Sequence, residues 1–439
     1  MNSFFFKNKY DSNPFMKLSG TKKDYSFKLA AFSQEALFQS LDKDLQDFIF
    51  QFGSACKLTY QELRQVSEIA IDLKMWGDNS VADRLNQIAS RYPAGNGNSK
   101  KRILQELQDY WNTLKAKPSD YSSNAPKVKS VVRKVTDNTG DHEIFGPCPV
   151  ASEKTVCCNL ITIDAVQGCS LGCSYCSIQT FYTDGAVAVE SNLEEKLDQI
   201  KLDPRKNYHI GSGQSSDSLA MGNRGGVLDA QLGFARKHPN IILEFKTKSK
   251  EIDYFLNSEL SPNIFISWSL NPQVIIDHEE HFTASLEQRL RAARTIADAG
   301  IIVGFHFHPI VYYRGWKNDY LQVASMVMDQ FSPDEVGMIS LGTLTFIKPA
   351  IQNLRKLGIP SKVLQMPLSN AVGKYSYSLD IKKKIFDGVY KAFTAWHEKV
   401  FFYFCMEERV LWQSVMGTCY SSNEAFEDAL FQSVSGKMK

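Results

Sequence analysis

The sequence predicts an α/β fold, namely a partial (β/α)6 barrel with an N-terminal helical domain and a C-terminal helical extension. Short β-rich runs alternate with helical patterns six times in the middle of the chain, which is typical of parallel strands joined by crossover helices. The first ~120 residues and the last ~65 carry mostly helical periodicity instead. We therefore expect domains at 1–125, 126–375 and 376–439.

The expected elements follow from the spacing of apolar residues. Spacings of three and four indicate amphipathic helices in the N-terminal domain, at 34–50, 60–76, 81–88 and 103–114. Pro, Gly, Asn and Ser mark a loop at 93–99 and a second break at 117–126. The barrel strands are expected at 160–165, 208–211, 241–247, 264–269, 301–309 and 335–341. The helices between them are expected at 193–200, 227–237, 250–256, 284–299 and 319–330.

Composition narrows the class of protein. The chain has 439 residues, of which 43% are hydrophobic, so it can bury a large core. Its net charge of +2 neither requires nor excludes a nucleic-acid partner, because such binding needs only a local basic face. With no signal-peptide pattern and no apolar run of membrane-spanning length, we expect a cytoplasmic protein. The nine cysteines suit reduced thiolates better than a disulfide framework.

The most informative segment is 167–182, which contains three closely spaced cysteines after the first expected barrel strand. The carboxyl ends of barrel strands carry the chemistry in such folds, and two glycines in this segment allow the backbone to curl. Cys169, Cys173 and Cys176 would supply three irons of a 4Fe–4S cubane and leave the fourth iron open. The alternative is a structural zinc site, but zinc needs a fourth ligand and no second CxxC or His pair follows.

The spacing Cys169-x3-Cys173-x2-Cys176, with an aromatic residue before the last cysteine, resembles the radical SAM (S-adenosylmethionine) superfamily. The resemblance implies that the open iron binds SAM and that one-electron reduction cleaves it to a 5′-deoxyadenosyl radical, which abstracts a hydrogen atom. Roughly residues 155–380 resemble the spore photoproduct lyase family of DNA-repair enzymes. The matching segments, in order, are 168–179, 245–253, 266–271, 289–294, 299–300, Gly304, 309–310, 315–316, 348–350 and 373–377.

Position by position, the family resemblance implies that SAM contacts Tyr175, Ser216, Asp217, Lys248 and Ser269. The chemistry of these residues agrees with that role. Tyr175 can face an adenine ring, and Lys248 at a strand end can pair with a carboxylate. Ser216 and Asp217 lie in a glycine-containing turn that suits the amino end of SAM. For Lys248 the alternative is an ordinary surface lysine, and Ser269 alone carries no signal.

Two positions depart from the family pattern. The hydrogen-donating cysteine of the family falls on Gln214, and the tyrosine after the last cluster cysteine falls on Ser177. Amide N–H and serine O–H bonds are too strong to replace them as hydrogen-atom donors. Cys405 and Cys419 are candidate replacement donors, and two further thiols lie at 157–158. The alternative reading of all four thiols is a small buried hydrophobic side chain.

Together these features predict a radical SAM enzyme that is similar to spore photoproduct lyase, a carbon–carbon lyase, and that repairs a thymine photolesion in DNA. The alternatives are a radical SAM enzyme acting on RNA or a peptide, and a non-catalytic Fe–S protein that binds nucleic acid. The expected partners are DNA and a reductant such as flavodoxin or ferredoxin.

Basic clusters at 100–102, 127–134 and 382–384 are candidates for the phosphate-binding surface, although each can equally be a solvated lysine surface. Aromatic residues near strand ends would hold an extruded base. These residues are Tyr312, Tyr313, Trp316, Tyr375 and Tyr377.

Two groups of histidines are also notable. His306 and His308 alternate along the expected strand 301–309 and therefore face the same side. We interpret them as structural or substrate-binding residues, because no carboxylate close in sequence supports a second metal site. The segment 277–281 combines two histidines with three acidic residues, and we expect it to be a solvated polar loop.

Overall fold

The computed structural model describes residues 25–78, 81–92, 97–128, 134–148, 155–177, 186–213, 215–371 and 374–438. The chain forms two compact units, one made of Met1–Ala70 and Ser80–Gln108 and the other of Ile71–Asn79 and Asp109–Lys439. This division differs from the boundaries expected near residues 125 and 375, because short pieces of the N-terminal region belong to the larger unit. No helix within the described ranges is long and apolar enough to cross a membrane.

The N-terminal region is helical, as the apolar spacing predicts. Its helices are α1 (Tyr25–Phe32), α2 (Ala36–Gln39), α3 (Lys43–Cys56), α4 (Tyr60–Met75), α5 (Val81–Ser90) and α6 (Gly97–Lys115). The helix expected at 34–50 is divided into α2 and α3, because Asp42 has extended backbone torsions and starts a new helix. Of the loop expected at 93–99, residues 97–99 belong to α6, and 93–96 lie outside the described residues.

The larger unit is built on a curled sheet with the strand order β14-β10-β9-β8-β7-β6-β3-β2, which confirms the predicted fold class. Six neighbouring strands follow the order of the chain and pair in parallel. They are β3 (Ile161–Ile163), β6 (Tyr208–Ser212), β7 (Ile241–Thr247), β8 (Ile264–Ser269), β9 (Val303–Ile310) and β10 (Val336–Thr343). The antiparallel strand β2 (Phe145–Pro147) lies at one edge.

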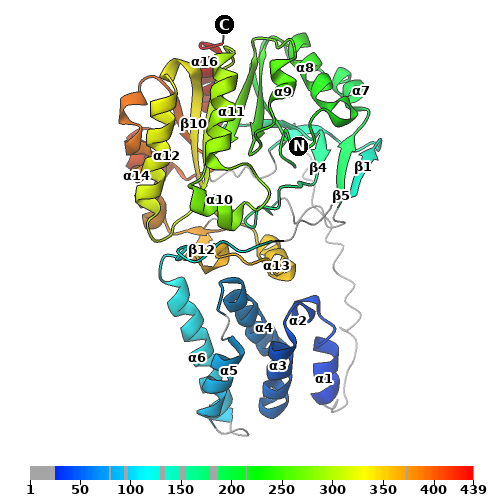
Figure 1. The fold of residues 1–439 in the computed structure, drawn as a ribbon, viewed down its shortest axis with the longest axis vertical. Helices are drawn as coiled ribbons and strands as arrows, with labels where there is room; N and C mark the ends of the chain where they lie inside the picture. Colours follow the sequence, from blue (N-terminus) through cyan, green and yellow to red (C-terminus); the bar gives the residue numbers. More distant parts are fainter. Residues whose placement is uncertain are drawn as a thin grey trace. The chain divides into compact units, whose positions relative to one another are not determined.

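Crossover helices connect these strands and lie beside the sheet (Figure 1). They are α7 (Leu193–Asp198), α8 (Val227–Lys237), α9 (Asp253–Leu256), α10 (Gln273–Glu279), α11 (Leu286–Asp298) and α12 (Trp316–Gln330). The start of α11 is fixed by a capping box. The Ser285 hydroxyl accepts a hydrogen bond from the Gln288 backbone N–H, and the Gln288 side-chain oxygen accepts one from the Ser285 backbone N–H. Its apolar face packs against β8 and β9.

Two small sheets and the remaining helices complete the unit. One sheet joins β1 (Lys134–Asn138), β5 (Ala186–Glu190) and β4 (Val166–Gln167), and the other joins β11 (Thr345–Phe346), β13 (Lys374–Tyr377) and β12 (Leu368–Ala371). The remaining helices are α13 (Lys348–Leu357), α14 (Leu379–Ala392), α15 (Arg409–Met416) and α16 (Asn423–Ser435). Short 3-10 turns lie at Arg224–Gly226, Pro333–Glu335, Val363–Gln365 and Thr394–Trp396.

The C-terminal region contributes directly to the barrel sheet. Its apolar run forms β14 (Phe401–Phe404), which pairs in parallel with β10. Four consecutive aromatic residues favour a strand because they pack well on a pleated surface. The helix α16 contacts β6, β10 and β14, and Val434 lies against Gly337 at the start of β10. The region from 376 onward is therefore more than a helical extension, since it adds the eighth strand and covers the amino-terminal end of the barrel.

Removal of one aromatic ring tests whether β14 belongs to the core. Phe404 is fully buried, and its ring centroid lies 4.5 Å from Phe386 and 5.2 Å from Trp412. We expect Phe404→Ala to lower the free energy of unfolding by about 3–5 kcal/mol, because it leaves a cavity. Val410→Ala, on an exposed side chain of α15, should change it by no more than about 0.5 kcal/mol in the same urea titration.

Candidate functional site

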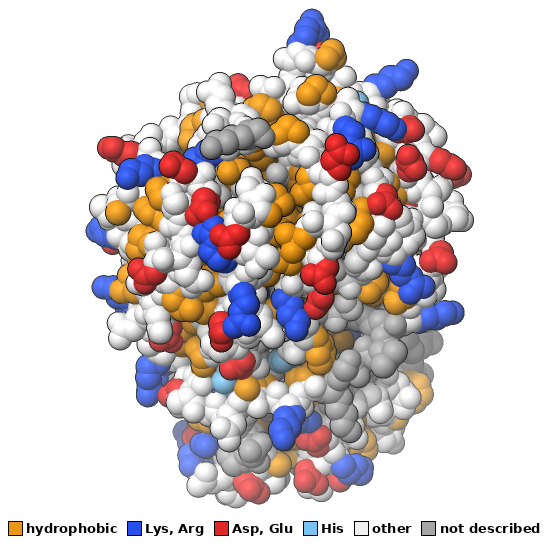
Figure 2. Space-filling model, turned by 45° about the horizontal axis from the view of Figure 1, so that its top comes forward, with side chains coloured by type: hydrophobic (Ala, Val, Ile, Leu, Met, Phe, Trp, Pro, Cys, Tyr) orange, Lys and Arg blue, Asp and Glu red, His pale blue; other side chains and the backbone are white. Residues whose placement is uncertain are grey.

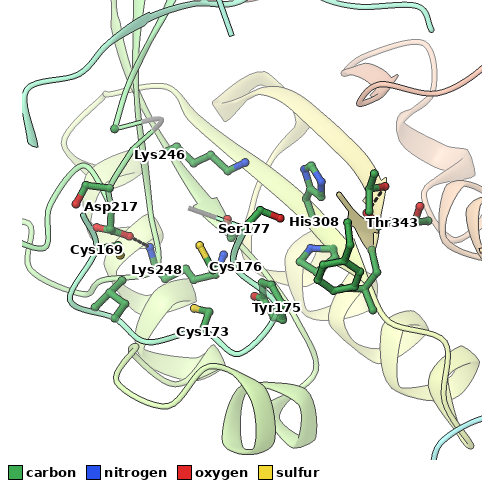
Figure 3. Close-up of a pocket in the computed structure, with 18 of the residues that line it drawn as sticks. Cys169, Cys173, Tyr175, Cys176, Ser177, Asp217, Lys246, Lys248, His308 and Thr343 are labelled. Carbon is green, nitrogen blue, oxygen red and sulfur yellow. Dashed lines mark hydrogen bonds between the residues drawn. The ribbon is translucent and has the colours of Figure 1, made fainter. Parts of the chain in front are cut away.

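The three cysteines of the motif lie on the loop that follows β4 and line one cavity of about 310 Å³ (Figure 3). Glycine is required at two places in this loop. Gly168 has φ +82°, and a Cβ there would come within 2.7 Å of the Ala186 carbonyl oxygen. Gly172 has φ +64°, and a Cβ there would come within 2.9 Å of the Phe282 ring. The loop can therefore follow this path only with glycine at both positions.

The cavity lies at the carboxyl end of the barrel strands. Residues that end or follow β6, β7, β8, β9 and β10 all contribute to its wall. This is the end at which barrel enzymes place their chemistry, and the loop with the cysteines covers it from one side.

The cysteine loop is held by two adjacent buried carboxylates, Glu279 and Glu280. Both side chains are essentially inaccessible to solvent, with relative exposures of 0% and 1%. The expectation that 277–281 is a solvated loop is therefore wrong. The backbone carbonyl of Glu279 accepts from the Ser174 N–H at 2.8 Å, and Glu280 forms a β-bridge with Cys173. The loop is thereby attached to the end of α10.

The Glu279 carboxylate is surrounded by donors. It accepts hydrogen bonds from the Tyr121 hydroxyl at 2.7 Å, the Ser361 hydroxyl at 2.7 Å and the Lys362 backbone N–H at 2.9 Å. The Ser174 hydroxyl, inside the cysteine loop, donates as well. Burial raises the pKa of Glu279, although these four hydrogen bonds act in the opposite direction. The carboxylate thus joins the loop to two distant segments of the larger unit.

Glu280 forms a buried ion pair with Arg289 of α11, whose side chain is also inaccessible to solvent. It also accepts from the Asn271 amide at 2.8 Å and from the Tyr175 hydroxyl. Burial would raise the pKa of Glu280, but the charges of Arg289 and Lys248 and the two hydrogen bonds lower it to about 2. The carboxylate is therefore ionised at neutral pH and holds Tyr175 beside the cysteines.

The five residues expected to contact SAM all line the same cavity as the cysteines. Ser216 is buried, and its hydroxyl has no hydrogen-bond partner among the described residues, so it is available to a bound molecule. Asp217 is engaged within the fold instead. Its carboxylate accepts from the Thr247 hydroxyl at 2.8 Å and from the Lys248 backbone N–H at 2.7 Å. Their roles toward SAM stay predictions.

The chemistry of the cysteines fits an iron–sulfur cluster. Burial raises the pKa of Cys169 to about 12 and that of Cys173 well above its usual range, so both are thiols until a metal displaces their protons. In the described part of the chain, no three His, Cys, Asp or Glu side chains are arranged around a single metal ion. A cubane binds each thiolate to a different iron, so its ligands need not converge on one point. Three thiols on one loop are thus a ligand set that can hold three irons of a cubane.

The roles of the two candidate hydrogen donors stay predictions, and Cys405 directly precedes Met406, which lines the cavity. Neither Cys405 nor Cys419 is among the described residues that line the cavity, although Ser177 is. Cys405 follows β14, its N–H donates to the Leu341 carbonyl at 2.8 Å, and burial raises its pKa to about 12. Cys419 accepts from the Arg409 guanidinium at 3.7 Å. Gln214 lies outside the described residues.

The histidines of β9 have different surroundings. His306 belongs to a buried polar network in the barrel interior, in which its Nε2 contacts Glu244 Oε1 at 2.6 Å and its Nδ1 contacts Ser340 Oγ at 2.5 Å. The second Glu244 oxygen contacts His209 Nε2 at 2.8 Å. His308, two residues farther along the strand, lines the cavity. Sequence reasoning missed Glu244 because its partners lie on three other strands.

The expected nucleic-acid surface is only partly present. Tyr313, Trp316 and Tyr377 are buried core residues, so they cannot stack on a base. Lys382 is buried in an ion pair with Glu407 at 2.7 Å, so it cannot contribute to the basic cluster expected at 382–384. Lys100 pairs with Glu62 at 2.7 Å, and the cluster at 127–134 lies largely outside the described residues. Figure 2 shows basic and acidic side chains interspersed over the face in view.

A curled half-barrel with three cysteines on a loop at the carboxyl end of its parallel strands is the arrangement of a radical SAM protein. A family model described as "Spore photoproduct lyase" matches residues 156–387, which is more than half of the chain. The chain belongs to the spore photoproduct lyase family.

Relatives and solved structures agree with this assignment. The spore photoproduct lyase of Clostridium acetobutylicum is 27% identical over 176 residues, which cover 39% of this chain and 52% of the relative. That of Bacillus subtilis is 26% identical over 236 residues, 50% of this chain and 68% of the relative. The chain thus spans only about half the length of the first of these relatives.

A solved spore photoproduct lyase complexed with dinucleoside spore photoproduct matches with a TM-score of 0.55 and 20% identity, covering 72% of this chain and 96% of that one. A doubly substituted spore photoproduct lyase with bound AdoMet and dinucleoside spore photoproduct matches with a TM-score of 0.53 and 20% identity over the same shares. At this identity the likeness supports the fold.

The buried ion pair offers a test of how the cysteine loop is held. In Glu280→Gln the Arg289 charge loses its partner in a dry site, so we expect the free energy of unfolding to fall by about 3–5 kcal/mol. On the same helix as Arg289, Glu287→Gln removes an exposed partner of Arg291, and we expect a change below about 0.5 kcal/mol. Denaturant titration of both variants measures the difference, and equal values would contradict the assigned role.

Proposed function

We propose that this protein is a radical SAM enzyme that repairs a thymine photolesion in DNA. One observation supports this most strongly: the three motif cysteines and all five residues expected to contact SAM line one cavity. They come from the cysteine loop and from segments at the ends of β6, β7 and β8. In the sequence these residues are up to about a hundred positions apart, and the fold brings them together. Membership of the spore photoproduct lyase family supports the reaction class.

In this proposal Cys169, Cys173 and Cys176 hold a 4Fe–4S cluster. When bound there, the cluster and SAM would supply the radical chemistry of hydrogen-atom abstraction. The chain provides the binding groups: the Lys248 ammonium for the SAM carboxylate, the unpartnered Ser216 hydroxyl for a polar group of SAM, and Tyr175 for the side of the adenine. The buried Glu280 orients Tyr175 through their hydrogen bond. A one-electron reductant such as flavodoxin or ferredoxin completes the system.

The substrate assignment rests on relatives. Two solved members of the family hold dinucleoside spore photoproduct, and we propose the corresponding lesion in DNA for this chain. The cavity agrees with an anionic substrate, since Lys246, Lys248 and Lys374 line it.

A second candidate is a radical SAM enzyme that acts on another substrate, either RNA or a peptide. Among the described residues that line the cavity, the thiols are those of the three motif cysteines alone, and Ser177 takes the place of the family tyrosine. In this candidate the reaction ends differently from that of the lyase. A non-catalytic Fe–S protein is a further alternative, and SAM cleavage distinguishes it.

The test uses anaerobically reconstituted protein with dithionite, SAM and DNA that carries spore photoproduct. We expect both 5′-deoxyadenosine and restored thymine, quantified by liquid chromatography and mass spectrometry. Cys173→Ala should abolish both products, because the cluster loses a ligand. Cys56→Ala, in the N-terminal unit, is the matched control and should retain both.

The outcomes separate the candidates. Deoxyadenosine without thymine would retain the radical chemistry and assign another substrate. Absence of both products from protein with an intact cluster would leave the non-catalytic alternative. Restored thymine would establish the lyase and make Cys405→Ala and Cys419→Ala the next variants, since the hydrogen donor must then be found.

A further inference from the structure

One basic side chain in the cavity forms no hydrogen bond or ion pair with any of the residues that the structure describes. Lys246 of β7 lines the cavity, and in Figure 3 its side chain extends toward His308 of β9. Within the described ranges the Lys246 ammonium forms no hydrogen bond and no ion pair, and the His308 ring nitrogens form none either. Burial and the nearby Lys248 lower the pKa of Lys246, and burial and Lys246 lower that of His308. An uncompensated charge in such a place costs stability unless a ligand offsets it.

The strand pattern explains why the described part of the barrel offers Lys246 no hydrogen bond or ion pair. Glu244 and Lys246 are two residues apart on β7, as His306 and His308 are on β9, so both pairs face the barrel interior. In the deeper layer both Glu244 oxygens are engaged, since they contact His209, His306 and the Ser267 hydroxyl, although His209 Nδ1 has no partner among the described residues. The upper layer, Lys246 and His308, opens into the cavity.

The neighbouring strand makes room for the histidine. On β10, a Cβ at Gly342 would come within 2.7–2.8 Å of three atoms of the His308 ring. Only glycine permits the ring to lie there. The fold therefore fixes the position of the His308 ring beside Lys246.

We propose that Lys246 and His308 form an oxyanion subsite that binds the phosphodiester group of the substrate inside the cavity. The subsite is distinct from the proposed SAM contact at Lys248, whose charge also faces the buried Glu280. An ammonium and an imidazole are point donors that suit the non-bridging oxygens of one phosphate. The inference rests on the proposed function, because it takes the substrate to be a nucleotide.

The experiment measures equilibrium binding to anaerobically reconstituted protein with SAM and without reductant, so that no turnover occurs. The ligands are thymidylyl-thymidine and its uncharged methylphosphonate analogue. We expect Lys246→Gln to bind the charged dinucleotide at least about tenfold more weakly than the wild type and to bind the uncharged analogue equally well. Lys250→Gln, on an exposed side chain of the same segment, is the matched control and should bind both ligands like the wild type.

Two further variants test the subsite without removing the lysine. His308→Gln and Gly342→Ala, which displaces the His308 ring, should both weaken binding of the charged ligand more than that of the uncharged one. Wild-type affinity of Lys246→Gln for the charged dinucleotide would overturn the inference. So would equal losses for both ligands, because they would place the effect outside the phosphate contact.

These results are separable from the proposed function. Charge-dependent binding through Lys246 without restored thymine would retain the subsite and reject the lyase activity. Restored thymine with binding that does not depend on Lys246 would retain the activity and reject the subsite.

Discussion

The buried pair of Glu280 and Arg289 is the interaction on which the site depends. It places a carboxylate in the interior with its charge balanced, and the same residue then holds Tyr175 through its side chain and Cys173 through a β-bridge. Its neighbour Glu279 attaches Ser174 in the same loop. These polar anchors fix the path of the cysteine loop. The position of the cysteines is thus set by residues that never touch a metal.

Strand β7 links the stability of the barrel to its chemistry. Its inward side chains change character along the strand, from Glu244 in a buried network, through Lys246 in the cavity, to Lys248 at the strand end. Toward the carboxyl end of the strand, the side chains thus change from one that contacts other side chains of the fold to ones that line the cavity. The barrel interior is therefore divided into a structural layer and a binding layer by the period of two in a strand.

Much of the fold was predictable because the barrel strands are short continuous apolar runs. Strands β7 and β8 and helix α8 begin and end where the pattern predicts. The cysteine motif was also predictable, because the spacing of its three cysteines in the sequence is enough to recognise it. The anchors could not be predicted, because the segment around Glu279 has the composition of a solvated loop, and Tyr121, its partner, lies 158 residues away. Tyr377 and Lys382 were misplaced on the surface for the same reason, since their burial depends on distant contacts.

The closing of the barrel base by α16 has a consequence for the synthesis of the protein. The Lys437 ammonium donates to the backbone carbonyls of Pro333, Val336 and Lys399, and α16 contacts β6, whose residues precede it by more than two hundred positions. A nascent chain on the ribosome cannot form these contacts until residue 437 has emerged from the exit tunnel. The base of the barrel can therefore close only after translation of this region, whereas the residues that line the cavity at the opposite end, up to Met406, emerge earlier.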